Sequence, residues 1–199
     1  MYGLWLSKIL RTMIYLTADT HFLHGNIREY CSRPFQSTLE MDETLINNWN
    51  SIISWQDDVY HLGDFALGNI YLIDKILNRL QGKIYYIRGN HDQWLKKSKV
   101  AEQRLIWVKD YFELKVQDEE MNLTQFLVMS HYPILSWNKA SHGSWMLHGH
   151  CHGTLNQLNS TTARLDVGVD SHDYFPISYK QVKKIMTKRV FKPVDHHGT

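Results

Sequence analysis

The chain has 199 residues, 43% of them hydrophobic and 21% charged, which suits a soluble globular protein with one full-sized core. Its net charge of +2 is too small to indicate nucleic-acid binding by itself, and no apolar run approaches the roughly 20 residues of a membrane span. The two cysteines, Cys31 and Cys151, are far apart, which argues against a disulfide scaffold and favours a reduced, cytoplasmic chain.

The first twelve residues are predicted to lie outside the domain. Their apolar run is interrupted by basic residues, is too short for a signal peptide and precedes no small-residue cleavage site. A peripheral extension, or an upstream start ahead of Met13, is favoured over a membrane-surface helix. We therefore expect an N-terminal extension at residues 1–12, one domain over 13–190 and a C-terminal tail at 191–199.

The first regular element is a short β-rich run over residues 13–16, which leads to Asp19 and His21. We expect a buried strand that delivers these two side chains to its carboxyl end. A helix should begin near Ser37, because Ser37 and Glu40 have the spacing of a capping box and apolar residues then recur at helical intervals.

Two further units of strand and polar loop follow. A strand is predicted over 59–62, and it ends in Gly63-Asp64. A helix then covers roughly residues 70–80, with its apolar residues on one side. A third strand over 83–87 ends in the polar stretch 88–92, so each apolar run is followed by a polar cluster.

The second half of the chain is richer in strands. Residues 93–104 are polar and predict a helix or an irregular segment. Ser178 and Gln181 have capping-box spacing and open a closing helix that runs to about Met186. Further strands are predicted at 113–116, 124–129, 145–147 and 164–169, of which the second leads to His131 and the third to His150 and His152.

Strands that alternate with helices early and cluster late indicate an α/β fold, a two-sheet β-sandwich flanked by helices. In open α/β sheets, sites lie beyond the carboxyl ends of the strands, which is where the polar clusters fall. The candidate side chains at these ends are Asp19, His21, Asp64, Asn90, His91, His131, His150 and His152.

This set of side chains predicts a metal centre. Carboxylates and imidazoles bind borderline first-row divalent ions, and the lack of a thiolate cluster disfavours a structural zinc knuckle. Seven ligands drawn from these eight side chains would be too many for one ion and would suit two, if one carboxylate bridges them. Two ions roughly 3.5–4 Å apart can hold a hydroxide between them and bind the oxygens of a phosphoryl group.

Five motifs together resemble the calcineurin-like metallophosphoesterase family, in particular its small, compact bacterial and phage members. The motifs are Asp19-x-His21, Gly63-Asp64, Gly89-Asn90-His91-Asp92, the single His131 and Gly149-His150-x-His152. Each motif alone is weak or only moderately specific, and the resemblance rests on all five in order, each after an apolar run. It implies the family's two-sheet fold, with the metal site at the strand carboxyl ends.

The resemblance also implies a role for each residue. One ion would be held by Asp19, His21 and His152, the other by Asn90, His131 and His150, and Asp64 would bridge them. His91 would face the phosphate and protonate the leaving oxygen, and Asp92 would orient His91. Manganese is the expected metal, with iron, zinc, nickel or cobalt as alternatives.

Four further residues are candidate substrate contacts. His24 and Asn26 follow the first motif closely and could reach the phosphate, with loop capping as the alternative. Arg33 and Arg88 could pair with a substrate phosphate, although for each a salt bridge within the protein, at the surface or just behind the ligands, is favoured.

The predicted activity is hydrolysis of phosphate monoesters or diesters by a hydroxide held between two metal ions. The chain has no room for a large cap domain, and an open site favours a nucleotide-like substrate. A nuclease on DNA or RNA is the alternative enzyme, although such an enzyme would need a basic groove, which the net charge does not indicate. A non-catalytic metal-binding module is the alternative outside enzymes, and the complete ligand set argues against it. The oligomeric state is left open.

Overall fold

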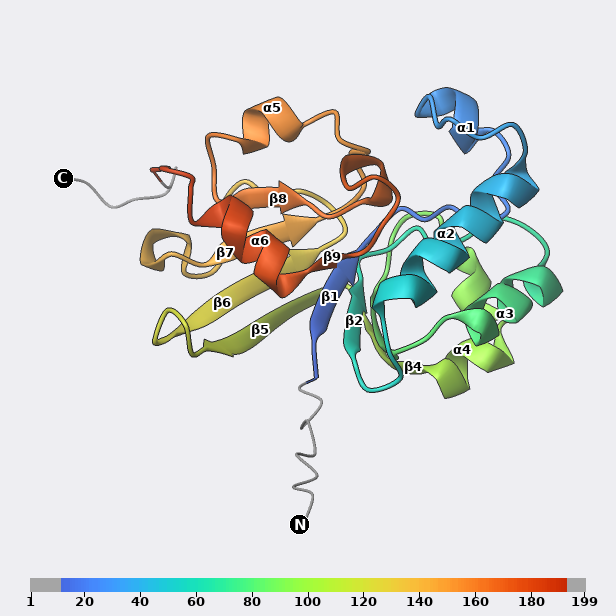
Figure 1. Ribbon diagram of the computed structural model, residues 1–199, viewed down its shortest axis with the longest axis horizontal. Coiled ribbons are helices and arrows are strands. Elements are labelled where there is room, and N and C mark those ends of the chain that lie inside the picture. The colour runs from blue at the N-terminus through green and yellow to red at the C-terminus, as the bar shows by residue number, and fades with distance from the viewer. Residues whose placement is uncertain (1–11, 193–199) are drawn as a thin grey trace, which may run out of the picture.

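The computed structural model describes residues 12–192, so nearly all of the expected extension and most of the expected tail lie outside the described residues. The described chain forms two mixed β-sheets flanked by helices, which confirms the predicted fold class (Figure 1).

The first sheet supplies three of the loops that matter below. Its members are β1 (Ile14–Thr17), β2 (Asp58–His61), β3 (Lys83–Ile87), β4 (Leu105–Lys109) and β9 (Ile177–Ser178). They lie in the order β4-β3-β2-β1-β9, in which β1 to β4 run parallel and β9 runs antiparallel to β1.

The second sheet supplies the remaining loops. It consists of β5 (Tyr111–Asp118), β6 (Leu123–Ser130), β7 (Trp145–His148) and β8 (Arg164–Asp166), side by side in sequence order. β5 and β6 pair antiparallel along eight residues each, whereas β6, β7 and β8 run parallel.

The helices are mostly short. They are α1 (Ile27–Tyr30), α2 (Thr38–Ile52), α3 (Ile70–Arg79), α4 (Lys99–Arg104), α5 (Asn156–Asn159) and α6 (Tyr179–Met186), with 3-10 turns at Asp92–Lys96, Ala140–His142 and Val169–Ser171. Figure 1 shows α2, α3 and α4 gathered beside the first sheet, and α5 beyond β8. Within residues 12–192, none of these helices has the length and apolar character that crossing a bilayer requires.

Both predicted helix starts are confirmed, but only one has a complete capping box. Ser37 Oγ accepts a hydrogen bond from Glu40 N at 3.1 Å, while the Glu40 carboxylate accepts from Gln36 N, one residue before the position that a capping box requires. Ser178 and Gln181 make the full reciprocal pair at the start of α6. At the start of both helices, these hydrogen bonds satisfy backbone N–H groups that would otherwise lack a partner.

The prediction of a strand over 164–169 is wrong in its second half. β8 ends at Asp166, whose carboxylate accepts hydrogen bonds from Gly168 N at 2.8 Å and Gly153 N at 3.0 Å. These bonds turn the chain into the 3-10 segment Val169–Ser171. β4 and β9, which the sequence analysis did not predict, extend the first sheet on either side.

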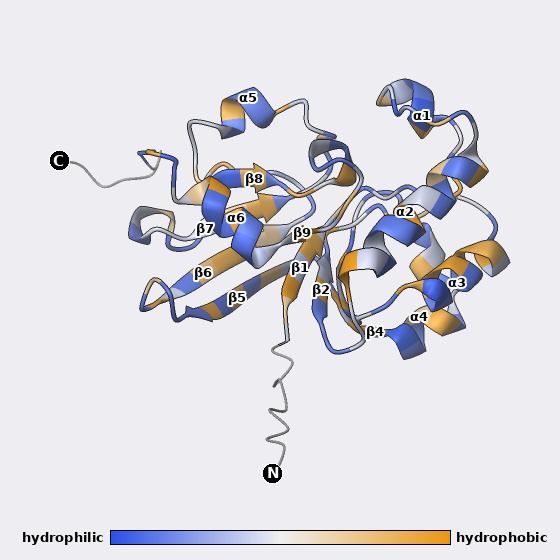
Figure 2. Cartoon of the chain, in the orientation of Figure 1, coloured by the Kyte–Doolittle hydropathy of each residue, from blue (hydrophilic) through white to orange (hydrophobic). Residues whose placement is uncertain are grey.

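Two apolar cores explain why the parallel strands are hydrophobic on both faces. On β1, Tyr15 packs toward the core shared with the helices and Leu16 packs into the core between the sheets. On β3, Tyr86 and Ile87 divide in the same way, as the two-residue period of a strand requires. Figure 2 shows the hydrophobic residues gathered on the strands and mostly hydrophilic residues on α6. This burial on both sides fixes where the strand ends lie.

The carboxyl ends of β1, β2, β3, β6 and β7 meet at one edge of the two sheets. Asp19 N donates to Gly63 O at 2.9 Å, which ties the loop after β1 to the loop after β2. An isolated parallel bridge between Ala18 and Gly168 joins the first sheet to the chain that follows β8. The loops that carry the predicted site residues are therefore held together by backbone pairing.

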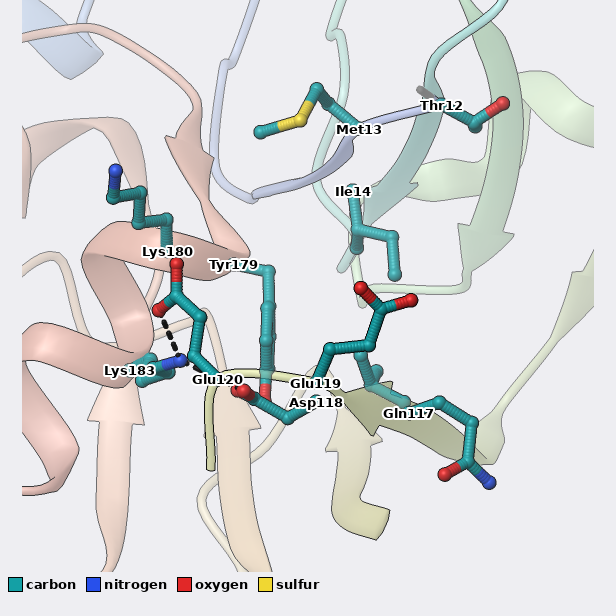
Figure 3. A pocket seen from close by; sticks show the side chains of 11 residues that line it. Thr12, Met13, Ile14, Gln117, Asp118, Glu119, Glu120, Tyr179, Lys180 and Lys183 are labelled. Carbon is teal, nitrogen blue, oxygen red and sulfur yellow. Dashed lines mark hydrogen bonds and ion pairs between the residues drawn. The ribbon is translucent and has the colours of Figure 1, made fainter. Parts of the chain in front are cut away.

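A separate pocket lies at the opposite edge, where β1 and β6 begin (Figure 3). Met13 and Ile14 line it together with the end of β5 and the start of α6. Asp118 accepts hydrogen bonds from Tyr179 Oη at 2.9 Å and from Lys183 Nζ at 2.8 Å. These contacts anchor α6 to the β5–β6 hairpin and lie away from the edge that carries the predicted site residues.

His61, at the end of β2, is completely buried. Thr20 Oγ1 donates to Phe65 O at 2.8 Å, so it is left to accept from His61 Nε2 at 3.1 Å. The imidazole stacks on Tyr86, with ring centroids 5.1 Å apart. Burial lowers the pKa of His61 to about 4, because the cationic form would lose its hydration.

The His61→Gln variant should therefore show a weaker acid dependence of stability than the wild type. Below about pH 6.5 the unfolded chain binds a proton at His61 that the folded chain excludes until about pH 4. The free energy of unfolding should fall by on the order of 3 kcal/mol for this reason between pH 7 and 4. Urea unfolding across that range measures it, with the exposed His142→Gln as control. Equal pH slopes in His61→Gln and wild type would contradict the assignment.

Candidate metal centre

The strand ends bring the predicted ligands together in two groups. Asp19, His21 and His152 form one, and Asp64, His131 and His150 form the other. In each group, one ligand atom per residue lies within 4.8 Å of the others. Each group draws on loops of both sheets.

Asp64 stands between the two groups. Its Oδ2 lies 3.6 Å from His21 Nε2 on one side and 3.5 Å from His131 Nε2 on the other. Asn90 Oδ1 lies 3.0 Å from His131 Nε2, which adds an amide oxygen to the second group. A carboxylate in this position can touch two ions at once, as a bridging ligand must.

The donor atoms of the first group fit a divalent cation. Asp19 Oδ1 and His21 Nε2 are buried and lack a hydrogen-bond partner among the described residues. Burial raises the pKa of Asp19 to about 8, and burial lowers the pKa of His21 to about 2, so the protein alone favours uncharged forms of both. A cation would offset the burial of the carboxylate and use the imidazole lone pair, which gives both atoms a partner.

Hydrogen bonds fix which nitrogen of two histidines is free. His131 Nδ1 donates to Leu62 O at 2.8 Å, and His152 Nδ1 donates to Asp170 Oδ2 at 2.7 Å. In both rings, Nε2 is therefore the nitrogen that points to its group, the usual arrangement around metal-binding histidines.

The charges around Asp64 and His152 also shift their pKa values. Burial would raise the pKa of Asp64, but the hydrogen bond and charge of His131 outweigh it and lower the pKa to about 2. Burial would lower the pKa of His152, but hydrogen bonds to Asp170 and Cys31 and the charge of Asp19 outweigh it and raise the pKa to about 10.

The backbone is strained where the ligands lie. Non-glycine residues seldom have positive φ, and each such residue costs on the order of 1 kcal/mol. Five of the seven predicted ligands have it: Asp19 (φ 55°), His21 (50°), Asp64 (58°), His150 (69°) and His152 (46°). The strain gathers at one edge of the sheets, which supports a functional role for that edge.

The motif glycines make room for the carboxylates. A Cβ on Gly149 would lie 2.5 Å from Ala18 Cβ and 2.7 Å from Asp19 Oδ2. A Cβ on Gly89 would collide with Asp64 Oδ1 in the same way. These two positions therefore require glycine for close approach of the chain to the carboxylates.

His91 and Asp92 have different surroundings. The exposed His91 donates its backbone N–H to Asp64 Oδ1 at 2.8 Å, and its ring centroid lies 5.5 Å from that of His21. Asp92 is buried and accepts hydrogen bonds from the backbone of Asp64 at 2.9 Å and of Gly89 at 2.7 Å, and from the Trp94 indole at 2.9 Å. These hydrogen bonds of Asp92 hold the loops together, and its expected role in orienting the His91 imidazole stays a prediction.

The four predicted substrate contacts divide into two pairs. His24 is half-buried at the site, with Nδ1 3.1 Å from His21 Nδ1, and the exposed Asn26 makes no side-chain cap on α1. Arg33 is buried in an ion pair with Asp170, and Arg88 pairs with Asp110 at 2.6 Å. For both arginines the internal salt bridge is the arrangement observed, and the guanidinium of Arg33 is inaccessible to a phosphate.

Three residues that the sequence analysis did not single out lie at the site. Asp170 and Cys31 each lie beside His152, and the Tyr132 ring lies 4.7 Å from that of His150. The position of Tyr132 directly after the predicted ligand His131 was the one available signal. Nothing local in the sequence marks Asp170 or Cys31.

Comparison with known proteins identifies the family. Residues 12–197 match the sequence model described as calcineurin-like phosphoesterase. The chain belongs to this family. An uncharacterized protein of Methanocaldococcus jannaschii is 35% identical over 181 residues, which cover 88% of this chain and 92% of that relative. The sequence resemblance is therefore confirmed.

A solved structure agrees with the fold of this calcineurin-like phosphoesterase. A protein of unknown function from Aquifex aeolicus superposes with a TM-score of 0.65 at 22% identity, covering 88% of this chain and all of that one. At this identity the likeness concerns the fold alone. The family match places the chain among metal-dependent phosphoesterases, in agreement with the two ligand groups.

Metal-stripped protein should bind two Mn²⁺ ions per chain. Because bound ligands stabilise the folded state, Mn²⁺ at about 100 times its dissociation constant should raise the unfolding temperature by on the order of 10 °C over protein in chelator. Asp19→Ala should bind one ion fewer and lose about half of that rise, while His142→Ala should match the wild type. Equilibrium dialysis and thermal unfolding measure both quantities. A wild-type stoichiometry below two, or two ions on Asp19→Ala, would contradict the assignment.

Proposed function

We propose that the protein is a phosphoesterase that hydrolyses phosphate monoesters or diesters, of nucleotide type, with two divalent metal ions, manganese first among the candidates. The observation that carries this proposal is the position of Asp64 between two ligand groups. One group contains Asp19 Oδ1 and His21 Nε2, which are buried and have no hydrogen-bond partner among the described residues. Membership of the calcineurin-like phosphoesterase family supports the reaction class.

The ligand sets follow from the two groups. Asp19, His21 and His152 would hold one ion, and Asn90, His131 and His150 the other, with Asp64 shared. When bound, such a pair of ions lowers the pKa of water and neutralises charge on phosphoryl oxygens. Hydrogen bonds from Nδ1 of His131 and of His152 orient each ring so that its Nε2 faces the ligand group.

His91 is the proposed general acid. Its backbone N–H is bound to Asp64 Oδ1 at 2.8 Å, which fixes the residue next to the shared carboxylate. Its imidazole is exposed, so it can reach an ester oxygen that lies over the two groups. From there His91 would give a proton to the leaving oxygen, while His24, 6.3 Å away between ring centroids, would donate a hydrogen bond to the phosphate.

The exposure of the site supports a substrate that extends away from the protein. Asn90, His91, Tyr132 and His150 are all exposed around the two groups. A phosphate at this position would lie over the two ligand groups, while the rest of the ester would extend along the surface. A nucleotide fits this arrangement better than a small metabolite that needs full enclosure.

The Mn²⁺-loaded protein should hydrolyse an aryl phosphomonoester, the matching diester or both. Asp64→Ala and His131→Ala should each lower kcat/KM by more than about 100-fold, because each removes a proposed ligand. The release of the aryl alcohol measures turnover, and His142→Ala serves as a control with an exposed loop histidine. A wild-type protein that binds two ions and hydrolyses neither ester nor any nucleotide would refute the proposal in favour of a binding module. Cleavage confined to nucleic acid, falling steeply with salt, would favour a nuclease.

The role of His91 predicts a dependence on the leaving group. His91→Ala should lower kcat by about 10²- to 10⁴-fold on an alkyl ester, whose leaving oxygen needs a proton. The loss should be much smaller on a nitrophenyl ester, because that oxygen leaves readily as an anion. Steady-state kinetics on the two esters test this, with His24→Ala as a matched histidine variant. Equal losses on both esters would remove His91 from the acid role.

A further inference from the structure

Arg33 is buried and uses its whole guanidinium within the protein. Nε and Nη2 donate to the two oxygens of Asp170, at 2.7 Å and 2.8 Å, in a bidentate pair. Nη2 also donates to Asp19 O at 2.7 Å, and Nη1 donates to Thr20 O at 3.0 Å. With a further contact from Nη1 to Met41 Sδ at 3.5 Å, each of the five N–H bonds has a partner.

The two carbonyls that Arg33 binds belong to the first motif. Asp19 has a positive φ of 55° and His21 one of 50°, so the segment between them needs support to keep its conformation. The guanidinium lies against the carbonyls of this segment and leaves the Asp19 carboxylate and the His21 imidazole free to face the first group.

Asp170 connects Arg33 to the third member of the same group. Its Oδ2, which accepts from Arg33, also accepts from His152 Nδ1 at 2.7 Å. Its backbone position is fixed because Val169 N donates to Ala18 O at 3.1 Å, directly before Asp19. One continuous set of hydrogen bonds therefore joins His152 to the backbone of Asp19 and Thr20, directly before His21.

The second group has no share in this network. Asp64, His131 and His150 make none of the hydrogen bonds of Arg33 or Asp170. A buried ion pair is weak evidence for stability, because desolvation of the charges offsets their attraction. Its specific attachment to one ligand group points instead to a role in geometry.

We propose that Arg33 and Asp170 are positioning residues that preassemble the first metal site, by locking His152 against the Asp19–His21 segment. The proposal rests on the proposed function in one respect, that the two groups hold metal ions. Arg33 would set the backbone of the segment, and Asp170 would set the orientation and tautomer of His152. The two residues would act on one ion and leave the other unaffected.

The test is Mn²⁺ binding by calorimetry on Arg33→Lys and Asp170→Asn. Lysine keeps the charge but cannot make the bidentate pair, and asparagine keeps the shape but loses the charge. In each variant, one of the two ions should bind about 10- to 100-fold more weakly, and the other should keep its affinity. The matched control is Arg79→Lys, which breaks an exposed bidentate pair with Glu43, whose two contacts are both 2.6 Å.

Two backgrounds identify the ion that is affected. His150→Ala removes a ligand of the second group, and in this background Arg33→Lys should weaken the remaining ion by the same factor. Asp19→Ala removes a ligand of the first group, and there Arg33→Lys should leave the remaining ion unchanged. Equal weakening in both backgrounds, or none in either, would overturn the proposal. Loss of the native circular dichroism in both Arg33→Lys and Asp170→Asn would also overturn it, because the pair would then serve the fold.

Turnover separates this inference from the proposed function. Wild-type protein that binds two ions and hydrolyses no ester, with selective loss of one ion in Arg33→Lys, would refute the function and support the positioning role. Wild-type turnover with unchanged affinities in Arg33→Lys would do the reverse. Fewer than two ions on the wild type would overturn both.

Discussion

The burial of two carboxylates at the junction of two sheets is the constraint on which the rest of the site depends. Asp19 and Asp64 are 0% and 2% exposed, and an uncompensated carboxylate in such a place is strongly unfavourable. Backbone hydrogen bonds offset part of this cost: His150 N donates to Asp19 and His91 N donates to Asp64, both at 2.8 Å. Asp19 Oδ1 has no hydrogen-bond partner among the described residues, and a cation is proposed to lie there.

The packing of the sheets behind the loops offsets the free-energy cost of the strained backbone. Residues such as Leu16 and Ile87 fill the core between the sheets, while Trp49 and Tyr86 fill the core under the helices. Backbone hydrogen bonds between the loops, such as Asp19 N to Gly63 O at 2.9 Å and Gly149 N to His131 O at 3.0 Å, restrict how far one loop can relax without the others. Positive φ at the ligand positions therefore reflects convergence imposed by the strands, with local hydrogen bonds choosing the side-chain orientations.

The sequence predicted most of what is local and little of what is long-range. Apolar runs followed by polar clusters placed the strand ends, and β3 has the predicted bounds of residues 83–87. β4 was missed because Ile106 and its neighbours are partly exposed at a sheet edge, which blurs the pattern of a buried strand. The pair between Arg33 and Asp170 spans 137 residues, so no spacing could reveal it. From the sequence, Arg33 was a candidate for a substrate phosphate, although a salt bridge within the protein was favoured.

Each proposed metal site takes its ligands from both sheets. Asp19 and His21 follow β1 of the first sheet, whereas His152 follows β7 of the second. Asn90 follows β3, whereas His131 and His150 follow β6 and β7. Each ion in the proposed sites would thus act as a cross-link between the sheets. Sliding of one sheet over the other would pull the ligands of both sites apart together. Bound ions would therefore oppose this motion, and the motion would release them.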